Sequence, residues 1–240
     1  MKENLKKYLS SFSGCIGGNL DAPIWICGIE FGGKVDIPVV LEDIDRDHSK
    51  PNKGYYTGNP NSKFDEGLTK ILSIIEDNKE NENLFTKLDD KHFRMNLYPL
   101  PYPSVKSTDD YMDILGLHKQ TYYDLCENIR FPFLNNIYKT YKPKILLCFG
   151  TTFAEKFMSA FKNDDYIIYK KNVNNKKIIL YTNYENAIII CPFLRSRSGL
   201  NSDFEINTFG NEIKNIIRMI DGKLPNKLNN IVIKEKVMSL

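Results

Sequence analysis

The sequence predicts an α/β fold: a three-layer α/β/α sandwich with a central, mostly parallel sheet. The first observation is a set of short apolar runs bounded by glycine or proline, which is typical of strands buried on both faces. The second is that longer segments with apolar residues at helical spacing alternate with these runs. The third is size, because 240 residues, of which 42% are hydrophobic, suffice for one domain. Strands buried on both faces need helices on each side.

The N-terminal part of the chain contains a predicted helix, a predicted strand and a long irregular segment. Residues 1–12 place apolar side chains on one helical face, and 24–28 form a short apolar run between Pro23 and Gly28. Residues 29–62 contain three prolines, which interrupt every regular pattern. We therefore expect 29–62 to be irregular, and a loop of that length in a compact domain is usually functional or mobile.

The rest of the chain alternates helices with strands. Residues 93–104 read as a strand that runs into a proline-rich turn, and the helix expected at 119–139 should break or kink near Pro132. The segments "DYIIYKK" and "KKIILYT" flank "NVNN", which is typical of a hairpin. We expect residues 1–222 to form one domain and 223–240 to be a tail with a short strand in "NIVIKEKV". The remaining predicted elements are helices at 64–77, 151–161 and 203–220 and strands at 145–150 and 186–192.

Two of these helices have recognisable capping residues at their N-termini. Thr151 or Thr152 is a plausible N-cap for the helix that follows Gly150. Ser202 is followed three residues later by Glu205, the spacing of a capping box.

Composition excludes some classes of protein and leaves others open. The formal net charge is only +3, from 33 basic and 30 acidic residues, which neither demands nor excludes a nucleic-acid partner. No run of 18 apolar residues is present and the N-terminus does not read as a secretory signal, so we expect no membrane contact. The five cysteines include no CxxC pair, which argues against zinc and iron–sulfur sites and predicts buried free thiols in the cytoplasm. We expect no metal and no cofactor.

Ligands of parallel α/β sheets bind beyond the carboxyl ends of the strands. In this chain that rule selects the segments after Cys27, Asn96, Phe149 and Cys191. Three of these four segments carry unusual chemistry.

The segment "PIWICGIEFGGKV", residues 23–35, nearly matches a nucleotide-binding phosphate loop. The glycine and lysine spacing fits, but Val35 stands where the motif needs a hydroxyl residue. Pro38 and a β-branched run lead us to expect no helix after the loop, and a phosphate loop needs one. Glu30 would add a negative charge. A carboxylate held between glycines at a strand end is the alternative interpretation.

The other two segments carry an amide and two arginines. The amide of Asn96 offers a donor and an acceptor that can match the edge of a pyrimidine; the alternative is a cap on the turn before Pro99. Arg195 and Arg197, with Ser196 between them, suit backbone phosphates; the alternative is a solvated loop.

Aromatic residues and histidines give weaker signals. Tyr55, Tyr56 and Phe64 could stack on a base or belong to the core. The three histidines are expected to be surface or packing residues.

Taken together, three segments resemble the uracil-DNA glycosylase superfamily over about residues 20–220. The segment "GIEFGG" is similar to the family's first strand-end loop, with Glu30 at the acid position that handles water. The segment "FRMNLYPLPYPS" looks like the motif whose Asn reads the base, with Asn96 in that place, and "KPKILLCFGTTFAEKF" is similar to the strand–Gly–helix segment. The chain departs at the last motif, where Cys191-Pro192-Phe193 replaces the usual His-Pro-Ser, and at Phe31, which replaces a proline.

The resemblance implies a monofunctional DNA glycosylase that hydrolyses the N-glycosidic bond of a flipped-out modified or damaged base and leaves an abasic site. The base could be a hypermodified pyrimidine of viral DNA, in antiviral defence, or uracil, in repair. The implied roles are catalytic for Glu30 and Asn96, substrate-binding for Gly28, Phe31, Gly32, Tyr56, Phe64 and Tyr98, and DNA-binding for Arg195, Ser196, Arg197 and Asn201. The implied partner is single- or double-stranded DNA, without an obligatory protein partner. Two alternatives are a non-catalytic nucleic-acid-binding module with this fold and a nucleotide-dependent enzyme.

Overall fold

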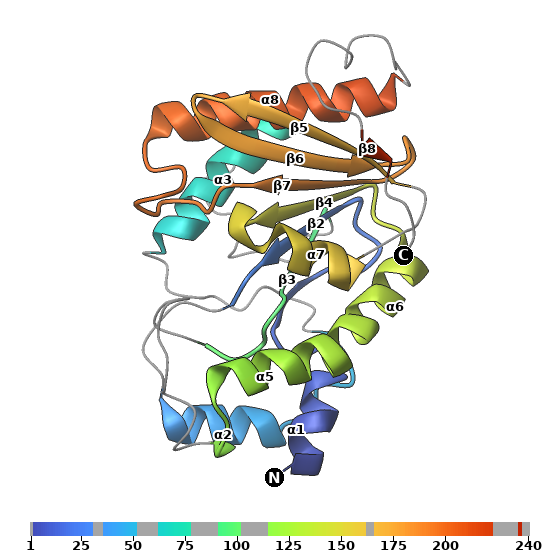
Figure 1. Ribbon diagram of the computed structural model, residues 1–240, viewed down its shortest axis with the longest axis vertical. Helices are drawn as coiled ribbons and strands as arrows, with labels where there is room; N and C mark the ends of the chain where they lie inside the picture. The colour runs from blue at the N-terminus through green and yellow to red at the C-terminus, as the bar shows by residue number, and fades with distance from the viewer. Residues whose placement is uncertain are drawn as a thin grey trace.

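A mixed sheet of eight strands lies at the centre of the computed structural model (Figure 1). The structure describes residues 2–30, 36–51, 62–77, 91–101, 115–161, 166–222 and 235–236. The strand order is β1-β3-β2-β4-β7-β6-β5-β8. The strands are β1 (Cys15–Gly18), β2 (Ile24–Gly28), β3 (His92–Asn96), β4 (Ile145–Phe149), β5 (Ile167–Val173), β6 (Lys176–Thr182), β7 (Ala187–Cys191) and β8 (Glu235–Lys236).

The four central strands β3, β2, β4 and β7 are parallel, as the buried apolar runs predict. The remaining neighbours pair antiparallel, so that five strands, the central four and β5, run in one direction. In register, Gly28 lies opposite Asn96 and Phe149 lies opposite Cys191. The carboxyl ends of the central strands therefore meet at one edge of the sheet.

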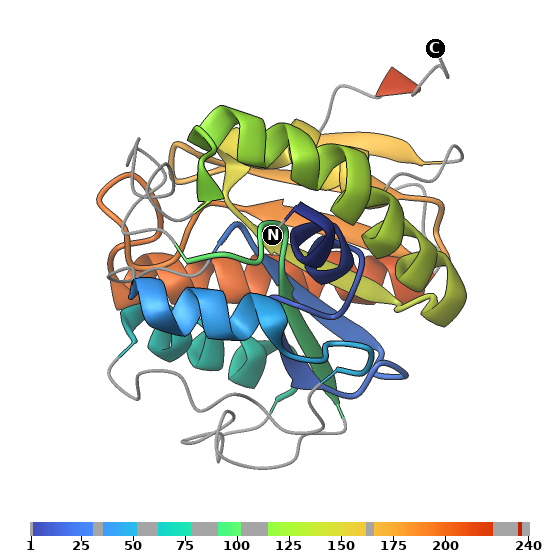
Figure 2. The same ribbon diagram turned by 90° about the horizontal axis from the view of Figure 1, so that it is seen from below.

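Helices cover both faces of this sheet. In Figure 2, α3 and α8 lie on one side of the strands, and α5 and α6 lie on the other. Two apolar clusters correspond to these faces: one contains Ile26 with residues of α3 and α8, and the other contains Trp25 and Cys27 with residues of α5, α6 and α7. The helices are α1 (Lys2–Leu9), α2 (Ile37–Asp45), α3 (Lys63–Ile75), α5 (Lys119–Leu125), α6 (Phe131–Tyr141), α7 (Ala154–Phe161) and α8 (Asp203–Asp221).

The break predicted in the helix at 119–139 is confirmed. A π-helical turn, Cys126–Arg130, lies between α5 and α6, and the Phe131 N–H donates to the carbonyl of Cys126, five residues earlier. Pro132 explains the break, because it has no N–H to donate and its ring would clash with the carbonyl four residues back. The widened turn removes that clash.

Several other predicted elements are confirmed. Ser202 forms the expected capping box with Glu205 at the start of α8. The hairpin turns at Asn174 and Asn175, whose φ angles of 48° and 61° suit a two-residue turn of type I′. All five cysteines are buried and free.

Three details of the predicted elements are wrong. The segment 29–62 is not wholly irregular, because α2 lies within it: Asp36 caps the N–H of Val39, and Pro38 occupies the first turn, where its missing N–H costs nothing. A helix therefore does follow the glycine loop, and Val35 and Glu30 remain as the residues that disfavour phosphate binding. Strand β1 was not predicted, because two of its four residues are glycines, which are uncommon in strands. The turn at Thr151 has Gly150 as its N-cap and no side-chain cap.

Candidate active site

The segments that follow the central strands remain joined by main-chain hydrogen bonds. The N–H of Leu97 donates to the carbonyl of Gly28 at 3.0 Å, and that of Tyr98 donates to Ile29 at 2.9 Å. At the other pair of strands, the N–H of Gly150 donates to Cys191 at 2.8 Å. The strand ends singled out from the sequence thus form one continuous rim along the sheet edge.

The side chain of Asn96 lies directly over Gly28 in this rim. A Cβ atom at position 28 would lie 2.3 Å from Asn96 Oδ1, so the amide occupies the space that a larger residue at position 28 would fill. Asn96 is only 5% exposed. Its main chain is held on both sides, since the N–H donates to Gly14 and the carbonyl accepts from Arg130, each at 3.0 Å. No hydrogen bond of the side-chain amide is found within the described ranges, so its donor and acceptor remain open.

Glu30 lies just beyond β2 and has a buried carboxylate. Its side chain is 5% exposed, and Oε2 accepts a hydrogen bond from the Tyr123 hydroxyl at 3.0 Å. The Lys119 ammonium lies 3.8 Å from Oε1 and is itself 11% exposed. Burial raises the pKa of Glu30, and Lys119 and Tyr123 offset only part of that effect. A carboxylate with a raised pKa and fixed neighbours suits proton transfer.

Lys119 and Tyr123 are the functional candidates that sequence reasoning missed. Both come from α5, whose first turn reads as a solvated helix start. Their four-residue spacing puts them on one helical face, but only the folded chain shows that this face meets Glu30. The Lys119 ammonium also lies 5.4 Å from the centre of the Tyr123 ring, a cation–π distance.

Tyr98 and Phe64 have different surroundings from those that a base-stacking role implies. Tyr98 is fully buried and stacks on Tyr123, with ring centres 4.0 Å apart and planes 19° apart. Phe64 packs between Phe149 and Phe193 at ring distances of 5.6 and 5.1 Å. Both rings therefore already have protein partners. The other predicted contacts, Phe31, Gly32 and Tyr56, lie outside the described residues.

Glu30 and Asn96 share the rim but are approached from opposite faces of the sheet. In β3, Phe93 and Met95 point toward the α5–α7 side. Arg94 between them pairs with Asp65 of α3, so by alternation Asn96 also faces α3 and α8. Glu30, by contrast, is held by α5. Among the described residues no hydrogen bond joins the two side chains. A ligand that contacts both must therefore reach across the edge of the sheet.

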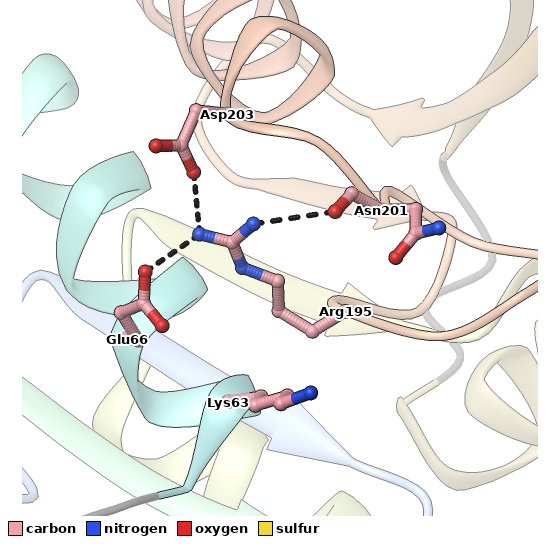
Figure 3. Close-up of a pocket in the computed structure, with 5 residues that line it drawn as sticks. All are labelled: Lys63, Glu66, Arg195, Asn201 and Asp203. Atoms are coloured by element: carbon pink, nitrogen blue, oxygen red, sulfur yellow. Dashed lines mark hydrogen bonds and ion pairs between the residues drawn. The ribbon is translucent and has the colours of Figure 1, made fainter.

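Arg195 is engaged within the protein. Its guanidinium lies 2.6 Å from Glu66 and 2.5 Å from Asp203, and it donates to the carbonyl of Asn201 at 3.2 Å (Figure 3). Lys70 contacts the same two acids at 3.0 and 2.9 Å. This network borders an open hollow of about 510 Å³. The hollow is lined by Lys63, Glu66, Arg195, Asn201 and Asp203.

The predicted DNA-binding loop thus divides into a structural part and an accessible part. Arg195 joins α3 to α8, and its charge is neutralised there. Ser196 has a buried hydroxyl without a hydrogen bond. Arg197 is exposed, and no ion pair of Arg197 is found in the described part of the chain. The accessible cation is therefore Arg197.

Two of the histidines are packing residues, as expected. His92 is buried and lies 2.7 Å from Glu76, and the His48 ring lies 2.8 Å from the carbonyl of Asp43. His118 occupies the N-cap position of α5, and its side chain makes no capping hydrogen bond. Within the described ranges, no cluster of His, Cys, Asp and Glu side chains is arranged to hold a metal ion, and no helix is long and apolar enough to cross a membrane. Neither a protein-family model nor a curated protein matches this chain.

Proposed function

We propose that the protein is a DNA glycosylase with a three-layer α/β/α fold that hydrolyses the N-glycosidic bond of a modified or damaged pyrimidine. The observation that carries the proposal is the rim: a buried carboxylate follows β2, and an open amide ends the neighbouring parallel strand β3. Helices on both faces of the sheet support the sandwich. The five free thiols support a cytoplasmic protein.

The proposed reaction begins with a base that has left the DNA stack. Asn96 hydrogen-bonds to its edge, and the glycine at position 28 lets that amide lie close to the main chain. Glu30 stabilises the cationic sugar and accepts a proton from the water that attacks C1′. Tyr123 and Lys119 hold the carboxylate in place. Proton acceptance requires ionised Glu30, so the raised pKa would confine activity to pH values above it.

DNA contact in this proposal relies on Arg197 rather than Arg195. An exposed arginine without an ion pair can neutralise a phosphate, whereas Arg195 would first have to leave Glu66 and Asp203. Ser196 and Asn201 belong to the same loop, and in this proposal they help to fix the conformation in which the loop contacts DNA.

A non-catalytic nucleic-acid-binding module is the second candidate. The observation that favours it is Cys191, which is fully buried where the family that this chain resembles commonly has the His that stabilises the departing base anion. Burial raises the pKa of this thiol well above its usual range, so it cannot supply a charge at neutral pH.

The test is base excision from oligonucleotides that hold uracil, 5-hydroxymethyluracil, glucosylated 5-hydroxymethyluracil or glucosylated 5-hydroxymethylcytosine. Alkali then cleaves the DNA at any abasic site. We expect the wild type to cleave at least one of them, Glu30→Gln to lose at least about 100-fold in rate, and Glu42→Gln, an exposed glutamate paired with Arg46, to match the wild type. Salt-dependent binding without abasic product would favour the binding module. Activity in Glu30→Gln equal to wild type would refute the mechanism.

A further inference from the structure

Arg130 is a fully buried arginine directly behind Asn96. It ends the π-helical turn Cys126–Arg130, and no part of its side chain is exposed. One guanidinium nitrogen, Nη2, donates to the carbonyl of Asn96 at 3.0 Å. The other, Nη1, lies 3.3 Å from the Ser13 hydroxyl and 3.4 Å from the carbonyl of Ser11. A π-turn inside a helix often marks a functional position.

No carboxylate neutralises this guanidinium in the described part of the chain. Its hydrogen-bond acceptors include carbonyl and hydroxyl oxygens, and its charge lowers the pKa values of three buried thiols, those of Cys15, Cys27 and Cys126. Burial raises the pKa of Cys15 to about 11 and that of Cys126 to about 12, although Arg130 lowers both. The thiols are therefore neutral at physiological pH, whereas an arginine keeps its charge. Arg130 is therefore a buried cation with no counter-ion among the residues that the structure describes.

A buried charge without a counter-ion is unfavourable, and a side chain does not need a charge to donate hydrogen bonds to carbonyls. A neutral amide side chain could donate to the same carbonyls. The charge itself therefore calls for an explanation, and the hydrogen bond to the Asn96 carbonyl suggests one: the guanidinium adds positive potential at the end of β3. In a low-dielectric site such a field favours an anion.

We propose that Arg130 is a positioning residue for the excision reaction: it holds the main chain at Asn96, and its charge stabilises the departing base as an anion. This inference rests on the proposed glycosylase function. In the reaction, the bond between C1′ and the base nitrogen breaks, and its electron pair leaves with the base. The water oxygen bonds to C1′, and the water proton passes to Glu30. Arg130 transfers no proton. Its charge would replace that of the histidine in the last motif of the family that this chain resembles, a role that the buried Cys191 thiol cannot fill.

The first experiment compares leaving groups. The probes are DNAs that hold the base excised by the wild type and the same base with a ring fluorine, which is the better leaving group. We expect Arg130→Gln to slow excision of the poorer leaving group at least about tenfold more than that of the fluorinated base. Arg130→Lys, which keeps the charge, should slow both by similar factors. Equal slowing of both bases by Arg130→Gln, or no slowing, would overturn the inference.

The second experiment needs no substrate and separates this inference from the proposed function. Asn96→Asp introduces a carboxylate as a stand-in for the base anion. At neutral pH we expect Asn96→Asp to lower Tm in both backgrounds. The decrease should be about 2–4 °C smaller when Arg130 is present than in the Arg130→Gln background. The control Asn207→Asp, on an exposed part of α8, should change Tm equally in both backgrounds. If Asn96→Asp lowers Tm equally in both backgrounds, Arg130 only holds the main chain at Asn96 and its charge does not stabilise an anion there. If this coupling is found but the wild type excises no base, Arg130 does stabilise an anion at this position and the glycosylase proposal fails.

Discussion

Gly28→Ala is the substitution that tests the geometry of the rim most directly. The new Cβ would lie 2.3 Å from Asn96 Oδ1, whereas ordinary contacts begin at 3.4 Å, so the amide must retreat by the difference, about 1.1 Å. The φ angle of Gly28 does not lie in the left-handed region, so alanine itself fits the backbone. The whole penalty therefore comes from one atom of one side chain.

The size of the penalty follows from that displacement. Misplacing a reacting or binding group by about 1 Å can cost about 100-fold in rate, or about 2.7 kcal/mol. Forcing an extra methyl group into a packed site costs about 1–3 kcal/mol of stability. In an Asn96→Ala background the methyl group has room, and Gly28→Ala should then be neutral or stabilising by up to about 1 kcal/mol, because it restricts the unfolded chain.

The assay is a double-mutant cycle by urea unfolding, with excision rates measured alongside. Gly67→Ala in α3 is the matched control. The nearest atom to its new Cβ would be an Ile206 methyl carbon at 3.3 Å, and helices prefer alanine over glycine by about 1 kcal/mol. If Gly28→Ala destabilises the protein equally with and without the Asn96 side chain, the amide does not lie over Gly28 and the reasoning is wrong.

Three further predictions concern charge at the rim and on the loop. Because folding raises the pKa of Glu30, its protonated form favours the folded state, and this contribution is lost as pH rises from the unfolded value of about 4.3 through the folded value; urea unfolding should show Glu30→Gln more stable than wild type at pH 7 but not at pH 4. Tyr123→Phe removes a hydrogen bond that lowers the same pKa, so the acid limb of the pH–rate profile should move to higher pH; an unmoved limb would remove Tyr123 from the site. Arg197→Met should weaken DNA binding and reduce the salt slope by about 1, whereas Arg195→Met should lower Tm with little change in that slope; the reverse pattern in salt titrations would contradict this division.

Much of the fold could be predicted because its signals are local. A run such as Ile24–Cys27 must be buried on both faces, and a capping box such as Ser202 with Glu205 fixes a helix start. The missed helix α2 has a local explanation as well: proline in a first turn and proline in a loop look alike unless the preceding cap is recognised.

The candidate site was only partly predictable because its contacts are not local. Position along parallel strands brought Glu30 and Asn96 to one edge of the sheet, although on opposite faces of it rather than in one pocket. Lys119, Tyr123 and Arg130 reach that edge from a helical segment more than 20 residues away in sequence from either one, and no spacing rule connects them. Arg195 shows the opposite error, since its charge suggested a phosphate partner, but the folded chain supplies Glu66 and Asp203 instead.

The five buried cysteines offer a way to observe how the native protein opens. Three of them, Cys27, Cys148 and Cys191, lie in the central strands, while Cys15 lies in β1 and Cys126 in the π-turn. A thiol with a raised pKa and almost no exposed surface reacts with a disulfide reagent only after its segment has separated from the rest. Single-cysteine variants would therefore convert labelling rates into local opening free energies, one for each of the five elements that hold a cysteine.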